Sequence, residues 1–342
     1  MFPSAPTTRP DLSRRVFLGA LPAGLSCFSG GIGSNERLAA VVDKAMRDRA
    51  ASVLVARGRE VLIERHAPGH DAGHPREVAS VAKSMVAVLI AMAVEDGAIK
   101  GLDQAACDHI PAWRNDARAA ITVRHLMSMT SGLDDAGLAL RGVTGDQFDI
   151  NSRAPLRDAP GTRWAYNTAA YHLLFHLLAR ATGERFESHA RRRLLDPLGM
   201  TATSWITNEG DGATGRVTNY YSAASTARDL ARFGGLVLET GGGLITPGMV
   251  RALTTPSQTL NPSYGLLWWT NSRPGFDAAG QAGGLRFPTA PPDTVAALGA
   301  GGQAVMIVPS RRVIVVRQGS PPGTPQALDA LLSSVLDTLD AV

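Results

Sequence analysis

The sequence predicts an α/β protein in which an antiparallel sheet is flanked by helices and carries an inserted, all-helical region. Strand-like runs occur near both ends of the chain, two of them early and about four late. The stretch between them has apolar residues at helical spacing, joined by turns rich in proline, glycine and aspartate. Strands from both chain ends that pair in one sheet, with helices between them in sequence, give a layered fold with a helical insertion.

The expected elements follow the chain in three groups. Near the N-terminus we expect a helix over 35–49, strands over 52–57 and 60–66 around a Gly58-Arg59 turn, and a helix over 80–95. The middle stretch, about 100–215, has no convincing strand, and its clear helices are 168–182 and 184–194, the second ended by Pro197. Towards the C-terminus we expect a helix over 222–239, strands at 264–270, 294–298, 303–308 and 312–317, and a closing helix over 325–340. These elements predict an α/β sandwich domain from 35–100 and 216–342, with a mainly helical domain over 101–215.

The first 34 residues are interpreted as an export signal. Arg14 and Arg15 precede a short, weakly hydrophobic, glycine-rich run, which matches a twin-arginine signal. We therefore expect a periplasmic or secreted protein. Cys27 closes the run and is a candidate for lipidation, although the preceding residues fit a lipoprotein cleavage pattern poorly. No segment reaches 18 uninterrupted apolar residues, so we expect no transmembrane segment.

Composition and missing motifs exclude several functions. Hydrophobic residues make up 44% of the chain and charged residues 19%, which excludes a disordered protein. The formal charge is +4 and the basic residues do not gather on one predicted helix, so we expect no nucleic-acid partner. The two cysteines offer neither a disulfide framework nor a cysteine-based zinc site. The histidines at 66, 70 and 74 fall in a loop, and those at 172 and 176 fit helix packing. We therefore expect no metal and no cofactor.

The helix expected over 80–95 carries the first chemical signal. From Ser84 to Val94 it contains no charged residue, so it should be buried on every face. Lys83, one of only three lysines, sits one turn beyond Ser80, so both side chains project from the same side. A desolvated lysine can act as a base near neutral pH, and the helix N-terminus favours a developing negative charge on Ser80. This pattern indicates an activated serine nucleophile. The alternative is that Ser80 only caps the helix and Lys83 reaches solvent.

Several segments resemble serine β-lactamases and penicillin-binding proteins, in particular the class C β-lactamase and esterase branch. The segment Ala-Ser-Val-Ala-Lys-Ser at 79–84 looks like the nucleophile motif of that family. The other similar segments are His125 to Leu133, Pro160 to Asn167, and Thr226 to Gly234. The similarity runs in order from about residue 40 to 320. It implies the two-part fold of that family, with the active site between the sandwich and the helical region.

The resemblance also implies further site residues. In that family a tyrosine of a Tyr-x-Asn motif completes the base, and the matching residue is Tyr166. The asparagine position is occupied by Thr168, whose hydroxyl could bind Lys83 or a substrate amide. The third family motif, Lys-Thr-Gly or His-x-Gly, corresponds to Ala297-Leu298-Gly299. The backbone N–H groups of Ser80 and Ala300 would then form the oxyanion hole.

Two differences bear on the substrate. Ala297 replaces the cation that helps β-lactamases hold the substrate carboxylate, which argues for an ester or amide substrate instead. Arg286 is the nearest arginine in sequence that could take its place. The segment Tyr264 to Trp269, with the Gly-x-Gly-Gly-Gln sequence that follows Leu298, looks most like 6-aminohexanoate-dimer hydrolases and their esterase relatives. Trp268 and Trp269 are adjacent in an expected strand, so only one of them can line the substrate cleft.

The resulting hypothesis is a serine hydrolase that forms an acyl-enzyme with a small-molecule ester or amide. This describes a carboxylesterase or a 6-aminohexanoate-oligomer-hydrolase-like amidase. The alternatives are a β-lactamase or D-alanyl-D-alanine carboxypeptidase, and a non-catalytic penicillin-recognising protein. The sequence gives no indication of the oligomeric state.

The export interpretation predicts that replacing both Arg14 and Arg15 with lysine leaves the precursor in the cytoplasm, because the arginine pair is the feature by which a twin-arginine signal is recognised. Cell fractionation with an antibody to the protein measures this. Cys27→Ala should leave export intact and release the protein from membranes only if Cys27 is lipidated. Unchanged appearance of the double variant outside the cytoplasm would contradict a twin-arginine route.

Overall fold

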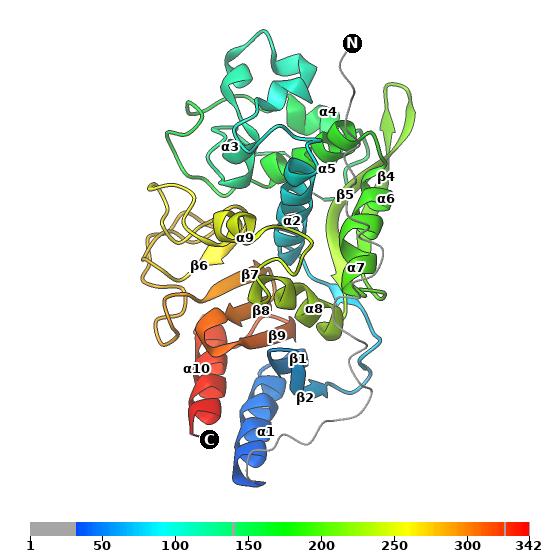
Figure 1. The fold of residues 1–342 in the computed structure, drawn as a ribbon. Coiled ribbons are helices and arrows are strands. Elements are labelled where there is room, and N and C mark those ends of the chain that lie inside the picture. The colour runs from blue at the N-terminus through cyan, green and yellow to red at the C-terminus, as the bar shows by residue number, and fades with distance from the viewer. Residues whose placement is uncertain (1–31, 139–140, 325, 342) are drawn as a thin grey trace, which may run out of the picture.

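A computed structural model describes residues 32–138, 141–324 and 326–341 (Figure 1). The segment interpreted as an export signal, with Cys27, lies outside the described residues except for its last three positions. Among the residues described, no helix has both the length and the apolar character needed to cross a membrane.

The main sheet has six antiparallel strands and draws them from both ends of the chain, which confirms the predicted fold class. Its strand order is β2-β1-β9-β8-β7-β6. The strands are β1 (Ala50–Arg57), β2 (Glu60–His66), β6 (Trp269–Thr270), β7 (Val295–Gly299), β8 (Gln303–Val308) and β9 (Val313–Gly319). The central strands β8 and β9 are buried along their whole length, because helices cover both faces of the sheet.

Two pairs of helices cover the main sheet (Figure 1). The terminal helices α1 (Ile32–Arg47) and α10 (Ala327–Asp340) pack against each other on one face. On the other face, α8 (Ala227–Leu238) contacts β8 and β9, and α2 (Val81–Glu95) contacts β7. Helix α2 also contacts α5 (Thr168–Thr182), so it lies between the main sheet and the helical region. This central position explains why α2 is apolar on every face.

The helical region consists of short helices around α5. Its other elements are the 3-10 helices η1 (Ala106–Asp108), η2 (Pro111–Trp113) and η3 (Ala117–Ala120), and the α-helices α3 (Val123–Met127) and α4 (Gln147–Ser152). Two further short helices lie outside this region, α9 (Pro247–Thr254) and η5 (Pro309–Arg311).

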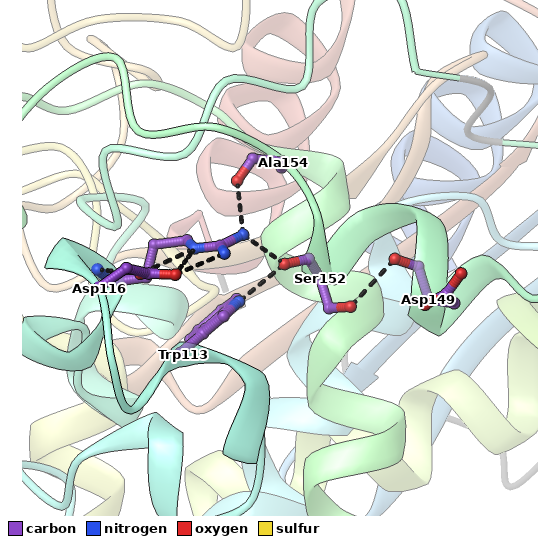
Figure 2. Close-up of polar contacts among 6 residues, drawn as sticks. Trp113, Asp116, Asp149, Ser152 and Ala154 are labelled. Carbon is purple, nitrogen blue, oxygen red and sulfur yellow. Dashed lines mark hydrogen bonds and ion pairs between the residues drawn. The ribbon is translucent and has the colours of Figure 1, made fainter.

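A partly buried polar cluster fixes α4 to the 3-10 helices (Figure 2). Trp113 Nε1 and Arg118 Nη1 both donate to the carbonyl oxygen of Ser152, each at 2.7 Å. Arg118 also pairs with Asp116 at 2.7 Å. Two donors on one carbonyl at the end of a short helix satisfy a group that the helix itself leaves without a partner. The cluster thereby holds α4 against its neighbours, and α4 in turn packs on α5.

The expectation that 100–215 contains no strand is wrong at its C-terminal end. A second sheet of three antiparallel strands, in the order β3-β5-β4, contains β3 (Arg76–Glu77), β4 (Ser204–Gly212) and β5 (Gly215–Ser225). Strand β4 contains Asn, Asp and two glycines, which are typical of turns. The strand accommodates the polar residues because the hairpin has an exposed face. It needs glycine at 210, because a Cβ there would lie 2.1 Å from the carbonyl oxygen of Gly145.

Three other boundaries differ from the prediction. The helix expected over 222–239 begins at Ala227, because 222–225 pair in β5. The strand expected at 264–270 is reduced to β6, since Leu267 has φ +61 and interrupts extended backbone. Pro197 does not end the helix before it. Helix α6 (Phe186–Ala190) continues through the π-helical turn η4 (Arg191–Leu195) into α7 (Asp196–Leu198), where Pro197 lies in a first turn that needs no N–H from it.

Candidate active site

Ser80 and Lys83 lie together at the N-terminal end of α2. The Nζ atom of Lys83 donates a hydrogen bond to Ser80 Oγ at 3.1 Å. Only 4% of Lys83 is exposed, and the Ser80 side chain makes no capping hydrogen bond. The alternative in which Ser80 caps the helix and Lys83 reaches solvent is therefore wrong.

Burial gives Lys83 the properties of a base. The pKa of Lys83 is lowered to about 7, mainly because burial removes water from the ammonium group; the nearby charge of Arg141 also lowers it, and Asp135 raises it. The Nζ atom lies 4.4 Å from the ring centre of Tyr171 and 5.1 Å from that of Tyr166. These rings stabilise the charged form only in part, because cation–π contacts are weaker than the hydration that burial removes.

The turn before α2 holds Ser80 in a strained position. Ala79 has φ +48, a left-handed conformation that is unusual for a residue with a side chain. The Val78 N–H donates to Ala223 O at 2.9 Å, and Ser222 Oγ donates to Ala79 O at 3.3 Å. Strand β5 therefore holds the turn on both sides of the strained residue.

Tyr166 reaches the same point from the segment before α5. Its hydroxyl shares a hydrogen bond with Ser80, and burial raises the pKa of Tyr166 to about 12 although that bond lowers it. Tyr166 is therefore neutral at physiological pH, with a proton that it can pass on. The structure thus brings Ser80, Lys83 and Tyr166 together, as their sequence motifs predict.

The two residues after Tyr166, Asn167 and Thr168, form the start of α5. Asn167 is buried, and its side chain accepts from Ala170 N–H at 2.6 Å and donates to Leu133 O at 2.8 Å. It caps α5 and has no free amide group for a substrate. Thr168 opens α5, and its backbone N–H donates to Asp135 Oδ2 at 2.8 Å.

Asp135 is a site residue that sequence reasoning missed. Its carboxylate accepts from the first N–H groups of α5, where negative charge is favoured, and it also raises the pKa of Lys83. It therefore links the start of α5 to the buried lysine. The available signal was an aspartate pair just after the segment His125 to Leu133, but nothing in the sequence shows that this turn folds back onto α5.

The end of β7 passes directly beside the Ser80 turn. A Cβ at Gly299 would lie 2.3 Å from the Val78 carbonyl oxygen and 3.1 Å from the Ser80 nitrogen, so only glycine allows this approach. Ala300 follows at once and lines the same cavity as Ala79. Ala297 is fully buried and brings no charge to the site.

The two tryptophans point to different places, although only Trp269 lies in a strand, so the expected alternation along one strand is not the reason. Trp268 is fully buried and stacks on Phe233, with ring centres 5.5 Å apart. Trp269 stacks on Tyr166 with ring centres 6.1 Å apart and an interplanar angle of 10°. Tyr264 packs edge-on against Trp269 at 4.7 Å. Trp269 and Tyr264 therefore form the aromatic wall next to Tyr166, while Trp268 belongs to the core.

Arg286 lies against the Trp269 ring of this aromatic wall. Its guanidinium carbon is 4.1 Å from the ring centre of Trp269, and its Nε is sealed from solvent without a hydrogen-bond partner. Burial lowers the pKa of Arg286, although a guanidinium remains charged under all ordinary conditions. A cation thus stands near the site although Ala297 supplies none.

The helical histidine pair is neutral and packed. Burial lowers the pKa of His172 to about 3 and that of His176 to about 4. The ring of His172 hydrogen-bonds to Gln147 at 2.9 Å, and His176 stacks on Phe148 with ring centres 3.7 Å apart. Across residues 32–138, 141–324 and 326–341, no three His, Cys, Asp or Glu side chains converge in a way that could hold a metal ion.

Comparisons with known proteins agree with this geometry. The family model described as Beta-lactamase matches residues 38–332. The esterase EstB of Burkholderia gladioli is 31% identical over 207 residues, and this alignment covers 51% of the chain and 52% of EstB. The chain thus spans about half the length of that relative.

Two solved structures show the same fold. A penicillin-binding protein homologue from Caulobacter crescentus has a TM-score of 0.69 at 19% identity, covering 91% of this chain and 98% of that one. A Bacillus anthracis protein assigned as a 6-aminohexanoate-dimer hydrolase has a TM-score of 0.68 at 18% identity, covering 87% of this chain and 80% of that one. With the family model matching most of its length, the chain belongs to the β-lactamase family of serine hydrolases and penicillin-binding proteins.

Proposed function

We propose that this protein is an exported serine hydrolase that cleaves an ester or amide bond through an acyl-enzyme. The observation that carries the proposal is the hydrogen bond between Ser80 Oγ and a buried Lys83 whose pKa is about 7. A serine with a buried lysine and a neutral tyrosine in contact has both a proton acceptor and a proton donor. The twin-arginine segment supports export.

In the proposed acylation, Ser80 Oγ forms a bond to the substrate carbonyl carbon while its proton passes to neutral Lys83, directly or through Tyr166. The carbonyl oxygen becomes an oxyanion that accepts hydrogen bonds from the N–H groups of Ser80 and Ala300. The bond to the leaving group then breaks, and the leaving group takes the proton back from the Lys83–Tyr166 pair.

Deacylation repeats these steps with water. Water adds to the acyl carbon and gives a proton to the same pair, the bond to Ser80 Oγ breaks, and Ser80 recovers its proton. Neither half-reaction requires a group from outside the chain other than substrate and water.

The substrate class follows from the charge around the site. A β-lactamase or carboxypeptidase must bind a substrate carboxylate, and charge-assisted hydrogen bonds from a cation on the oxyanion strand supply that. Ala297 cannot provide one. We therefore favour short-chain esters or small linear amides, and the esterase and 6-aminohexanoate-dimer hydrolase among the similar proteins support this choice.

One observation favours the second candidate, a β-lactamase or D-alanyl-D-alanine carboxypeptidase. Arg286 stands against Trp269 with an unpartnered Nε, and a substrate carboxylate would be a suitable partner. The complete set of Ser80, Lys83 and Tyr166 argues against a non-catalytic penicillin-recognising protein.

The substrate proposal predicts that p-nitrophenyl acetate or butyrate, or an aminohexanoate dimer, is hydrolysed at least about tenfold faster than nitrocefin in kcat/KM. Tenfold corresponds to about 1.4 kcal/mol, less than a charge-assisted contact contributes. Steady-state assays of the purified protein measure it, and Ser80→Ala is the control that should abolish turnover while remaining folded. Efficient nitrocefin hydrolysis would favour the second candidate, and Arg286→Gln should then reduce it.

The pKa of Lys83 sets the pH dependence. Lys83 accepts a proton only when it is neutral, so the logarithm of kcat/KM for p-nitrophenyl butyrate should rise as pH increases through about 7 and then level off. The high pKa of Tyr166, about 12, places any loss of its proton beyond the usual assay range. A flat profile from about pH 5 to 9 would show that Lys83 is not the base.

Gly299→Ala tests the close approach of β7 to the nucleophile. The added Cβ would collide with the Val78 carbonyl oxygen at 2.3 Å, so β7 must move and the N–H of Ala300 with it. We expect kcat to fall about a hundredfold or more, the usual effect of losing an oxyanion donor. Gly284→Ala is the matched control, because a Cβ there meets nothing within 4 Å. Full activity in a folded Gly299→Ala variant would contradict the assignment of Ala300.

A further inference from the structure

A cavity of about 420 Å³ lies next to the proposed oxyanion hole. It is lined by Ala79, which precedes the nucleophile, and by Ala300, but not by Tyr166 or Trp269. The leaving group must lie near the Tyr166 hydroxyl to receive its proton. The cavity is therefore placed for the other part of the substrate, the acyl chain that stays on Ser80. Its volume lies within the range of small-molecule pockets.

Three charged side chains line the same cavity, and their charges do not cancel. Arg141 Nη2 lies 3.1 Å from Glu77 Oε1, so these two form an ion pair. Arg76 instead donates to a ring nitrogen of His70 at 2.9 Å, and within the described parts of the chain it forms no ion pair. Loss of hydration and the charge of Arg76 both lower the pKa of His70, which favours the neutral ring. A neutral imidazole carries no negative charge, so it does not offset the charge of Arg76. The cavity thus has one guanidinium charge in excess.

Arg141 lines the cavity, and its charge also acts on Lys83 in the reaction centre. Its guanidinium carbon lies 5.8 Å from the ring centre of Tyr221, which gives the side chain a flat surface to lie on. Its charge is also the largest contribution to the low pKa of Lys83 after burial. A ligand group bound to Arg141 would therefore lie within a short acyl chain of the carbonyl that Ser80 attacks.

We propose that this cavity is an acyl-side subsite for a carboxylate, so that the preferred substrates are half-esters or half-amides of short dicarboxylic acids. This inference rests on the proposed function. A guanidinium offers paired N–H donors that match both oxygens of a carboxylate. Arg141 and Arg76 are then specificity-determining residues, and Glu77 competes with the substrate for Arg141. The subsite lies on the opposite side of the scissile bond from Arg286 and Trp269.

The experiment compares two esters that differ in one charge. p-Nitrophenyl hexanoate and mono-p-nitrophenyl adipate have acyl chains of the same length, and only the second ends in a carboxylate. The measured quantity is the ratio of kcat/KM for adipate to that for hexanoate, each corrected for spontaneous hydrolysis. The protonation state of Lys83 affects both substrates equally and cancels in the ratio. For the wild-type protein we expect a ratio of about ten or more.

Variants of the charged side chains test the assignment in both directions. Arg141→Gln should lower the ratio about tenfold, and Arg76→Gln should lower it as well. Glu77→Gln should raise the ratio, because it frees Arg141 for the substrate. Arg153→Gln is the matched control, since Arg153 is an exposed arginine paired with Asp149 on α4 and should leave the ratio unchanged.

The outcomes separate the inference from the proposed function. A wild-type ratio of one or less, or a ratio that Arg141→Gln and Glu77→Gln leave unchanged, overturns the subsite while Ser80-dependent hexanoate hydrolysis stands. If Arg141→Gln fails to fold by circular dichroism, Glu77→Gln decides, and no rise in the ratio counts against the subsite. If neither ester is hydrolysed faster than by Ser80→Ala, the proposed function fails and the subsite with it.

Discussion

The burial of Lys83 in the first turn of α2 is the interaction on which the rest of the site depends. Helix α2 lies between the main sheet and the helical region, and every residue from Val81 to Ala93 is buried. A lysine in this position loses its hydration, and its pKa falls to about 7. The packing that stabilises the fold therefore also converts an ordinary cation into a base, and Ser80 is the side chain to which that base donates its hydrogen bond.

Segments that are far apart in sequence come together around Ser80, and backbone contacts hold each of them in place. Ala79 is held in a left-handed conformation by hydrogen bonds to β5, and Gly299 lets β7 pass where no side chain would fit. Asp135 holds the start of α5, whose preceding segment places Tyr166. The site is thus fixed by the second sheet, the main sheet and the helical region together. A change in any one of them would alter the distance between the nucleophile and its proton acceptor.

Where the chain differs from the family motifs, the positive charges near the site lie at its edges and not on the strand β7. Thr168 stands where the family has an asparagine, the neighbouring Asn167 is used in capping α5, and Ala297 is sealed in the core, so none of these positions contributes a free amide or a cation. Arginines supply the positive charge instead. Arg286 lies against the aromatic wall on one side, and Arg141 lies near the Ser80 turn on the other. A substrate with a negative charge should therefore bind with that charge near Arg286 or near Arg141, depending on which of its parts carries the charge.

The sequence by itself determined the strands β8 and β9, the helices α2 and α5, and the pairing of Ser80 with Lys83, whereas Tyr166 was assigned only through the resemblance to the β-lactamase family. Long apolar runs and the spacing of Ser80 and Lys83 on one helix face are local properties, so they can be read without the fold. Only the tertiary structure decided that 204–212 is a strand, because its turn-like residues are accepted by pairing with β5 and by the contact of Gly210 with Gly145. It also decided the roles of Asp135 and Arg141, since the charge that reaches Lys83 depends on distances through space and not on positions along the chain.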